Sequence, residues 1–369
     1  MCEAIGILFG NSRIDGLQGL AEKRPIEALP FGRYRLLDFA LSSMVNSGIR
    51  TIGLITPYHN RTMLSHIGAG KAWFLERKAG GLFILPETIY GLVGRKEQFF
   101  LKDLALNIEY LQRDQAENVV ISSCNQVFNI NYHEVLDYHE DKNADITLVY
   151  KKFDTPNRKN SQTHLIMDEK QRVINFNDYD ELENSPLNFI NMLIIRRQIL
   201  LDIINEYQEQ EGFDLLDAIT IKLKSLKIYG YSFQGYIGII QSVQDYYQCS
   251  MDILDTKIRE KLFLGLDRIH TKLLDNPPTC HGEHAKVRNS LIASGCMIEG
   301  KVENSVISRG VIIEPEAQVI NCIIMSKCWI RAQTILNHVI LDKLVEVGEG
   351  RVLQGNSENP MVVLKRAKI

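Results

Sequence analysis

The sequence predicts an α/β domain with a mostly parallel sheet, followed by a parallel β-helix of hexapeptide repeats. Two patterns lead to this fold class. Up to about residue 265, short apolar runs alternate with stretches whose apolar residues recur at helical spacing. From residue 289 on, apolar residues recur mostly every five or six positions instead. We therefore expect domains at 1–265 and 287–369, joined by a linker at 266–286 around Pro277 and Pro278.

The first domain alternates candidate strands with candidate helices. The stretch RLLDFALSSMVNSG has apolar residues at helical spacing and ends at Gly48, a residue type that often terminates a helix. A second helical stretch is FFLKDLALNIEYLQR. Ligands in such folds bind beyond the carboxyl ends of the strands, so we expect a site in the loops after Phe9 and Ser123. The candidate strands are AIGILF, TIGLIT, NVVISS, DITLVY and the segment around INMLII.

The second domain repeats one pattern. Its segments begin at Asn289, Asn304, Asn321 and Asn337, so the spacings are 15, 17 and 16 residues. About three hexapeptide steps per repeat indicate a triangular coil in which each step supplies one short face. Four coils are few, and we expect them to pack on the first domain or on another subunit.

The composition argues against several classes of function. A net charge of −3 gives no reason to expect a nucleic-acid partner. No apolar run approaches the ~20 residues that a membrane-spanning helix needs, so we expect no membrane partner either. The seven cysteines are odd in number and scattered, which predicts a reduced, cytoplasmic setting.

The string PFGRYRLLDFALSSMVNSGIR, residues 30–50, identifies a family. It closely resembles the N-terminal region of ADP-glucose pyrophosphorylases, also called glucose-1-phosphate adenylyltransferases, of bacterial glycogen synthesis. Residues 289–317 and 340–350 match the same family, and the resemblance covers nearly the whole chain. It implies a Rossmann-like nucleotidyltransferase domain and a left-handed β-helix.

In this family a sugar 1-phosphate attacks the α-phosphate of a nucleoside triphosphate, and pyrophosphate leaves. The protein must hold a polyanion with a glycine-rich loop and with cations. The corresponding loop here carries one extra residue, and only Gly10, Asn11, Ser12 and Arg13 remain as a residual phosphate loop. The resemblance places the family's loop arginine at Gly16 and its lysine at Ile26.

The carboxylates that hold Mg²⁺ in the family are also replaced. The match to CNQVFNINY puts Asn125 at the first aspartate, and the match to YIGIIQSVQDYYQCSMDIL puts Ile239 at the second. The lysine that binds the sugar phosphate becomes Tyr179. Asn191–Leu193 and Phe99–Asp103 replace the small residues of the glucose and base pockets. We therefore expect no catalytic residue and no cofactor in this chain, with Mg²⁺ only at a catalytic partner subunit.

This combination resembles the regulatory, so-called D-type, subunit of ADP-glucose pyrophosphorylase. The resemblance implies a hetero-oligomer, expected to be a tetramer, with the catalytic subunit, whose activity this chain would raise or tune in glycogen biosynthesis. The family's basic residue before the first helix contributes to binding phosphorylated effectors, so Arg33, with Arg35 and Arg50, forms a candidate anion site. Asp38 is expected to pair with Arg35 near the helix start, a structural role.

Two other functions stay open. An active adenylyltransferase with a displaced metal site would use Asp178 or Asp245 as a substitute carboxylate. An acyltransferase working through the β-helix would need a catalytic histidine, and His338 is the only histidine in the repeats. His66 is expected to be a packing residue. The soft ligands of the stretch CHGEH, residues 280–284, are expected to form a plain connecting loop rather than a metal site.

Overall fold

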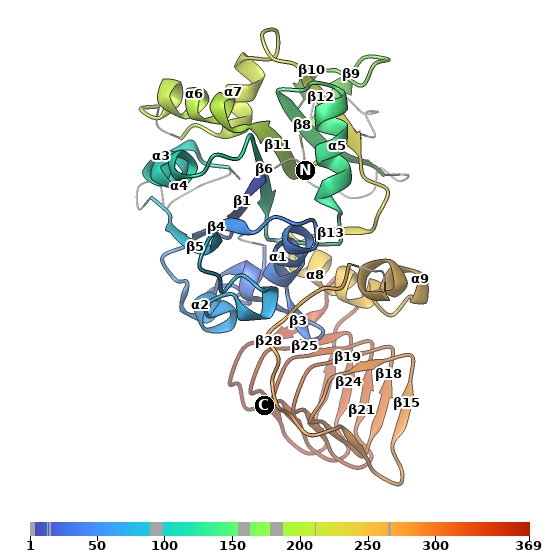
Figure 1. Ribbon diagram of the computed structural model, residues 1–369. Helices are drawn as coiled ribbons and strands as arrows, with labels where there is room; N and C mark the ends of the chain where they lie inside the picture. Colours follow the sequence, from blue (N-terminus) through green and yellow to red (C-terminus); the bar gives the residue numbers. More distant parts are fainter. Residues whose placement is uncertain are drawn as a thin grey trace. The chain divides into compact units, whose positions relative to one another are not determined.

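The computed structural model divides into two compact units (Figure 1). The first contains the described residues within 1–13, 39–124 and 128–235, and the second those within 14–38, 125–127 and 236–369. Arg13, Asp178 and Tyr179, which the sequence analysis names, lie outside the described residues. The structure describes residues 4–12, 14, 16–88, 99–153, 163–177, 187–210, 212–264 and 267–369.

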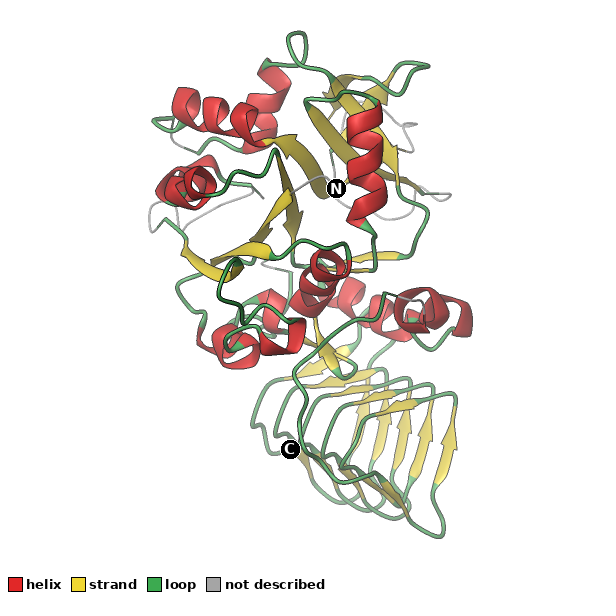
Figure 2. Ribbon diagram, viewed as in Figure 1, coloured by secondary structure: helices red, strands yellow, loops and turns green. Residues whose placement is uncertain are grey.

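The first unit is built on a nine-stranded mixed sheet with the order β10-β9-β11-β6-β1-β4-β5, in which β8 joins β11 and β12 joins β8 (Figure 2). The strands β1, β4, β5 and β6 are mutually parallel, as the sequence predicts. β11 lies between β6 and β8 and is antiparallel to both. Their bounds are β1 (Ala4–Phe9), β4 (Thr51–Thr56), β5 (Gly81–Pro86), β6 (Asn118–Ser123), β8 (Ile146–Lys152), β9 (His164–Met167), β10 (Val173–Asn177), β11 (Leu187–Arg196) and β12 (Ile228–Ser232).

Helices cover both faces of this sheet, because its central strands are apolar on both sides. Figure 1 shows α5 (Tyr132–Asp141) on one side, and α6 (Arg197–Tyr207) and α7 (Leu215–Ile221) on the other. Leu193 and Ile195 of β11 belong to the same buried cluster as the apolar face of α6. Among the described helices, none is both long and apolar enough to cross a membrane. Three further helices are α1 (Leu36–Asn46), which begins in the second unit, α2 (Arg61–Ile67) and the 3-10 helix η2 (Lys71–Trp73).

The stretch 99–113, predicted as one helical segment, forms two short helices that meet at Asn107. They are α3 (Leu101–Leu106) and α4 (Ile108–Arg113). The amide of Asn107 donates to the backbone oxygen of Asp103 at 2.7 Å and to that of Pro86 at 2.8 Å. Such side-chain bonds to the backbone compete with helical ones, so the helix is interrupted here.

The β-helix has three parallel sheets of five strands each, so it contains five coils rather than the four predicted (Figure 1). The additional coil begins at Cys280, within the stretch that the sequence predicts as linker. Apolar side chains fill the interior, and Ile298, Ile313 and Ile330 are fully buried. The first sheet contains β14 (Cys280–His281), β17 (Met297–Ile298), β20 (Ile312–Ile313), β23 (Trp329–Ile330) and β26 (Glu346–Val347); the second contains β15 (Lys286–Arg288), β18 (Lys301–Glu303), β21 (Gln318–Ile320), β24 (Ile335–Asn337) and β27 (Val352–Gln354); the third contains β16 (Leu291–Ile292), β19 (Val306–Ile307), β22 (Ile323–Ile324), β25 (Val339–Leu341) and β28 (Met361–Val363).

The register of the last repeat differs from the predicted one by a single residue. Asn289, Asn304 and Asn321 each turn a corner of the coil with a positive φ, and His338 takes the equivalent place in the next coil. Ile320 pairs with Asn337, which puts Asn337 at the end of its strand. The structural spacings are therefore 15, 17 and 17 residues. Asparagine tolerates the left-handed conformation better than most residues, which explains its recurrence at this corner.

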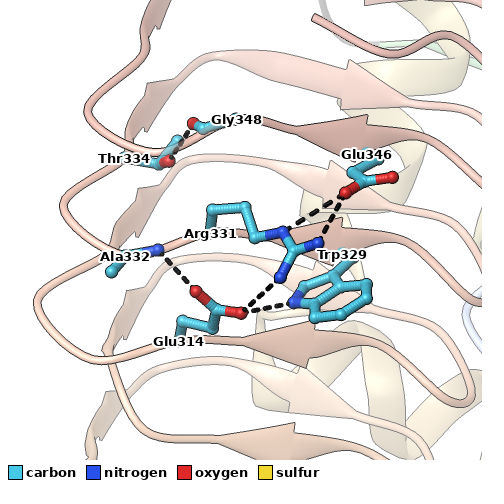
Figure 3. A network of polar contacts seen from close by, with 7 residues as sticks. All are labelled: Glu314, Trp329, Arg331, Ala332, Thr334, Glu346 and Gly348. Carbon is cyan, nitrogen blue, oxygen red and sulfur yellow. Dashed lines mark hydrogen bonds and ion pairs between the residues drawn. The ribbon is translucent and has the colours of Figure 1, made fainter.

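Polar side chains also link successive coils on the outer surface (Figure 3). Arg331 pairs with Glu314 at 3.2 Å and with Glu346 at 2.7 Å, and its guanidinium lies 3.3 Å from the ring centroid of Trp329. The indole N–H of Trp329 donates to Glu314 at 2.7 Å. Because Glu314 follows β20, Arg331 follows β23 and Glu346 begins β26, this network links three coils, and its partly exposed ion pairs add modestly to the packing of the interior.

The second unit also contains segments distant in sequence from the β-helix. The tyrosine hydroxyl of Tyr246 donates to the backbone oxygen of Pro30 at 2.6 Å, and that of Tyr247 to Asn321 at 2.8 Å. The elements of these segments are the 3-10 helix η1 (Ile26–Ala28), β2 (Pro30–Phe31), β3 (Tyr34–Arg35), β7 (Gln126–Phe128), β13 (Ile237–Ile239), α8 (Val243–Asp252), α9 (Thr256–Arg259) and the π-helix η3 (Glu260–Leu264).

We predict that Leu344→Gly stabilises the protein by about 1 kcal/mol, because leucine is strained at positive φ. Leu344 has a φ of 62° and a side chain that is 41% exposed, so little packing is lost. Gly295 and Gly310 have the same handedness at their turns. Chemical denaturation measures the change.

Leu273→Gly is the matched control, since Leu273 is 86% exposed and is not among the residues with positive φ. Glycine there should lower stability slightly by increasing the freedom of the unfolded chain. Equal destabilisation by both substitutions would contradict the strain at Leu344.

Candidate functional site

The loop after β1 keeps one glycine, and packing explains it. The backbone N–H of Gly10 donates to the oxygen of Ile55 at 2.9 Å. A Cβ atom at Gly10 would lie 3.0 Å from that same oxygen. Gly10 therefore lets β1 and β4 approach each other closely, and its N–H is used within the protein.

The next residue, Asn11, binds two buried carboxylates. Its side-chain amide donates to Asp103 Oδ2 at 2.8 Å and to Glu87 Oε2 at 3.2 Å. Asp103 is fully buried, and its other oxygen accepts from the N–H and hydroxyl of Thr88, both at 2.7 Å. The N–H of Tyr58 donates to Glu87 Oε1 at 2.9 Å. Two acidic groups thus lie beside the loop where the family resemblance implies that phosphates bind, and they would repel a polyanion.

Aromatic rings occupy the region that the resemblance assigns to the base. Phe99 is fully buried, and its ring centroid lies 5.0 Å from that of Phe9 in an edge-to-face arrangement. The ring centroid of Phe189 lies 6.5 Å from that of Phe99. On β11, Met192 and Leu193 are fully buried, so they contribute to the core.

Gly16 and Ile26 lie in the second unit, and neither position suits a cation. A Cβ atom at Gly16 would lie 2.7 Å from the backbone oxygen of Gln241, closer than real Cβ contacts. The backbone oxygen of Gly16 accepts from the backbone N–H of Val243 at 3.0 Å, and this bond holds the two backbone segments at their close distance. Ile26 is 1% exposed, so an ammonium group there would be removed from water. Ser12 is half-buried and belongs to the first unit.

The two positions of the family's metal carboxylates meet in this structure. β7, which follows Asn125, pairs with β13, which ends at Ile239. The N–H of Ile240 donates to the backbone oxygen of Asn125 at 3.2 Å, and the Asn125 amide lies 3.5 Å from the backbone oxygen of Ile240. Both side chains are 2% exposed. The positions are adjacent, as two ligands of one ion would be, but they supply a neutral amide and an alkyl chain.

The nearest substitute carboxylate with described structure, Asp245, caps a helix. Its Oδ2 accepts from the hydroxyl of Ser242 at 2.8 Å and from the N–H of Gln241 at 3.2 Å. Ser242 in turn accepts from the N–H of Asp245 at 3.1 Å and is the N-cap residue of α8, so Asp245 supports this cap from the first turn of the helix. Within the part of the chain that the structure describes, no group of three or more His, Cys, Asp or Glu residues could hold a metal ion.

The arginines of the candidate anion site lie in different surroundings. Arg50 belongs to the first unit, and its guanidinium donates to the backbone oxygen of Val45 near the end of α1. Arg33 and Arg35 belong to the second unit. Burial lowers the pKa of Arg35, and the nearby Asp38 partly opposes that shift. Asp38 Oδ2 accepts from the backbone N–H of Arg35 at 3.0 Å, so this acid has the structural role predicted for it.

Sequence reasoning missed two cations beside Arg35. Arg24 forms an ion pair of 2.8 Å with Asp342, and both side chains are almost fully buried. Burial, together with the charges of Arg35 and Arg24, lowers the pKa of Lys343 to about 8. No local pattern could reveal this cluster, because its members come from residues 24–35 and from the last coils.

The histidines named from the sequence have structural surroundings. His66 is 9% exposed, and its ring lies 5.8 Å from that of Trp73. His338 Nδ1 lies 2.8 Å from the hydroxyl of Tyr247, and its Nε2 lies 3.2 Å from the Asn321 amide. These contacts hold His338 at its corner of the coil.

Comparison with known proteins identifies relatives of both parts of the chain. A nucleotidyl transferase family model matches residues 15–179, and a model of the GlmU-like C-terminal hexapeptide domain matches residues 277–360. The glycogen biosynthesis protein GlgD of Bacillus subtilis is 33% identical over 368 residues, covering 98% of this chain and 96% of the relative. GlgD of Geobacillus stearothermophilus is 36% identical over 297 residues, covering 80% of this chain and 77% of the relative. The glucose-1-phosphate adenylyltransferase of Bacillus cereus is 28% identical over 374 residues, covering 98% of this chain and 97% of the relative.

We predict that Asn11→Ala destabilises the protein by about 2–3 kcal/mol, because it removes one hydrogen-bond donor from each of two buried carboxylates. Thermal or chemical unfolding of the full chain measures the effect. Asn205→Ala, at an exposed position of α6, is the control and should change stability by less than about 0.5 kcal/mol. An unchanged stability for Asn11→Ala would mean that Glu87 and Asp103 do not depend on this amide.

Proposed function

Because the chain belongs to the family of the glycogen biosynthesis protein GlgD, we propose that it is a regulatory, non-catalytic subunit of glucose-1-phosphate adenylyltransferase. That enzyme makes ADP-glucose and pyrophosphate from ATP and glucose 1-phosphate. In this proposal the partner is the catalytic subunit, the assembly is a hetero-tetramer in the cytoplasm, and Mg²⁺ binds only at the partner.

The observation that carries the proposal is the pair Asn125 and Ile239. Phosphoryl and nucleotidyl transfer depend on a divalent cation that neutralises the developing charge, and Mg²⁺ in such sites is bound through carboxylates. The backbone of this chain brings the two positions together, because Asn125 precedes β7 and Ile239 ends β13, the strand that pairs with β7. An uncharged amide and an alkyl group there cannot hold Mg²⁺ against water.

The loop after β1 supports the same conclusion independently. A catalytic loop would direct N–H groups and cations at phosphates. Here the Gly10 N–H is bonded to Ile55, and the amide of Asn11 is bonded to Asp103 and Glu87. These donors therefore bind acceptors within the protein. The two acids carry the same sign of charge as the phosphates that the catalytic family binds at this loop.

A non-catalytic subunit can still change the rate of its partner. It does so when it binds the active conformation of the catalytic subunit more tightly than the inactive one. This mechanism needs an intact fold and interaction surfaces but no reaction centre. The chain spans almost the full length of its GlgD relative from Bacillus subtilis, which agrees with this requirement.

We predict that this chain alone forms no measurable ADP-glucose, and that it raises the rate or alters the effector response of the catalytic subunit from the same organism. The measurement is ADP-glucose formation by each chain and by the co-purified complex. The control complex contains a catalytic subunit whose metal-binding aspartates are changed to asparagine.

If turnover belongs to the partner, the control complex is inactive. Mg²⁺-dependent turnover by this chain alone would reject the proposal and favour an adenylyltransferase with a displaced metal site. Loss of that turnover in Asp245→Asn would then locate the substitute carboxylate.

We further propose that a phosphorylated effector binds at Arg24, Arg35 and Lys343. Asp38 and Asp342 are the carboxylates whose charges act on these cations, so positive charge is in excess. Burial and mutual repulsion destabilise the charged forms of Arg35 and Lys343. A bound phosphate would relieve this repulsion and make charge-assisted hydrogen bonds.

We predict that Lys343→Met stabilises the free chain by about 1–2 kcal/mol at pH 7. The pKa of Lys343 is about 8 in the folded state and higher in the unfolded chain, so folding disfavours the bound proton. The stabilisation is complete below pH 8 and fades as pH rises toward the unfolded pKa. Unfolding curves across this pH range measure it, with exposed Lys257→Met as the control.

Inorganic phosphate tests the effector site with the same variants. Phosphate should raise the melting temperatures of the unaltered chain and of Lys257→Met. It should raise the melting temperature of Lys343→Met much less. Equal stabilisation of all three by phosphate would place the anion elsewhere.

A further inference from the structure

A short turn between α2 and β5 exposes a large aromatic side chain. The 3-10 helix η2 ends at Trp73, and the next residue, Phe74, is 65% exposed. Its neighbours in the sequence are both buried, since Trp73 is fully enclosed and Leu75 is 2% exposed. Phe74 therefore projects from the protein between two side chains that anchor its backbone. The whole turn, residues 71–78, belongs to the first unit.

Hydrogen bonds hold this turn in place. The indole N–H of Trp73 donates to the hydroxyl of Ser42 on α1 at 3.2 Å. The backbone N–H of Leu75 donates to the backbone oxygen of Gly70 at 3.1 Å. A partner would therefore meet a surface that is already formed, so little conformational freedom would be lost on binding.

The backbone of Phe74 is in the left-handed region, with a φ of 57°. A bulky residue is rarely found there, and glycine would relieve the strain. The folded chain gains little from this ring, because the ring remains largely in water while its backbone is strained. Strained residues concentrate at functional sites, which points to a role for Phe74 outside folding.

Exposed cations flank this ring in the sequence. Lys71, Arg77 and Lys78 are exposed, and Glu76 is the only acid of the turn. No ion pair joins these three cations to another residue that the structure describes. Burial lowers the pKa of Arg50, and the nearby charge of Arg77 lowers it as well. The turn is therefore positive, although the whole chain carries a net charge of −3.

We propose that the turn 71–78 docks on an acidic protein surface, with Phe74 inserted into an apolar pocket that carboxylates border. This inference rests on the proposed function, in which that surface belongs to the catalytic subunit. Aromatic anchors and arginines contribute much of the binding energy in protein interfaces. The cations of the turn would pair with carboxylates at the rim, where charge selects and orients the partner.

The charges of the turn favour a protein over a nucleic acid or a membrane. Lys71, Arg77 and Lys78 could neutralise only a few phosphates, and the rest of the chain is negative and would repel a polyanion. A helix that lies on a membrane surface needs a long apolar face opposite its cations. The helix of this turn, η2, has three residues.

The test measures the dissociation constant of the complex between the full chain and the catalytic subunit from the same organism. Phe74→Gly removes the anchor, so it should raise that constant about thirtyfold. Because glycine relieves the backbone strain, the melting temperature of the chain should not fall, whereas a structural role for the ring would lower it. Ile221→Ala, at a side chain that is 61% exposed on α7, is the control and should leave the dissociation constant unchanged.

Charge reversal tests the cations. Lys71→Glu combined with Arg77→Glu should raise the dissociation constant at low salt about tenfold, and should make it depend less on ionic strength. The matched control combines Lys170→Glu with Lys224→Glu, which change the net charge equally at exposed lysines of the same unit. This control should change the dissociation constant little.

Unchanged dissociation constants in both Phe74→Gly and the charge-reversed variant would overturn this inference and leave the proposed function intact. If the unaltered chain forms no complex with the catalytic subunit, the proposed function fails and this inference fails with it. Duplex DNA or anionic phospholipid vesicles provide the last comparison. Binding of either that both variants lose, with an unchanged subunit complex, would assign the turn to a polyanion and reject a protein partner.

Discussion

The buried ion pair between Arg24 and Asp342 is the constraint on which the second unit depends. Each charge has lost its water, so each needs the other, and removing one would leave a buried ion without a partner. The guanidinium also donates to Leu20 at 2.9 Å, which holds the N-terminal segment against the last coils. Arg24 therefore ties its own segment to the last coils, whereas Gly16 in the same segment is held by its bond to Val243.

Several described positions that the family uses for chemistry have structural roles in this chain. Asn11 satisfies buried acids, Gly16 allows a close backbone approach, and Ile26 fills the core. Asp245 starts a helix, although it is the nearest carboxylate to the second metal position in the sequence. These roles are mutually consistent, because a group that is bonded within the protein needs no substrate or ion to compensate it.

The sequence alone predicts the features of the fold that follow from local periodicity. The predicted strands of the sheet and the hexapeptide coils are present, because alternation and repeat length are properties of short stretches. The fifth coil was missed, since Cys280 and His281 lack the apolar pattern of the later coils. The acids that bind Asn11 could not be predicted either. Glu87 and Asp103 lie far along the chain, and only the folded sheet brings them to the loop.

The bonds of Asn11 also limit how this lineage could regain a phosphate loop. A change of Asn11 to the glycine of the catalytic family would open the loop but remove one donor from each of two buried carboxylates. Removing the acids first would take one acceptor each from the N–H groups of Thr88 and Tyr58 and two from the amide of Asn11. Every single step is opposed by folding, so the route back requires several simultaneous substitutions. Folding stability by itself thus opposes a stepwise return to a phosphate loop.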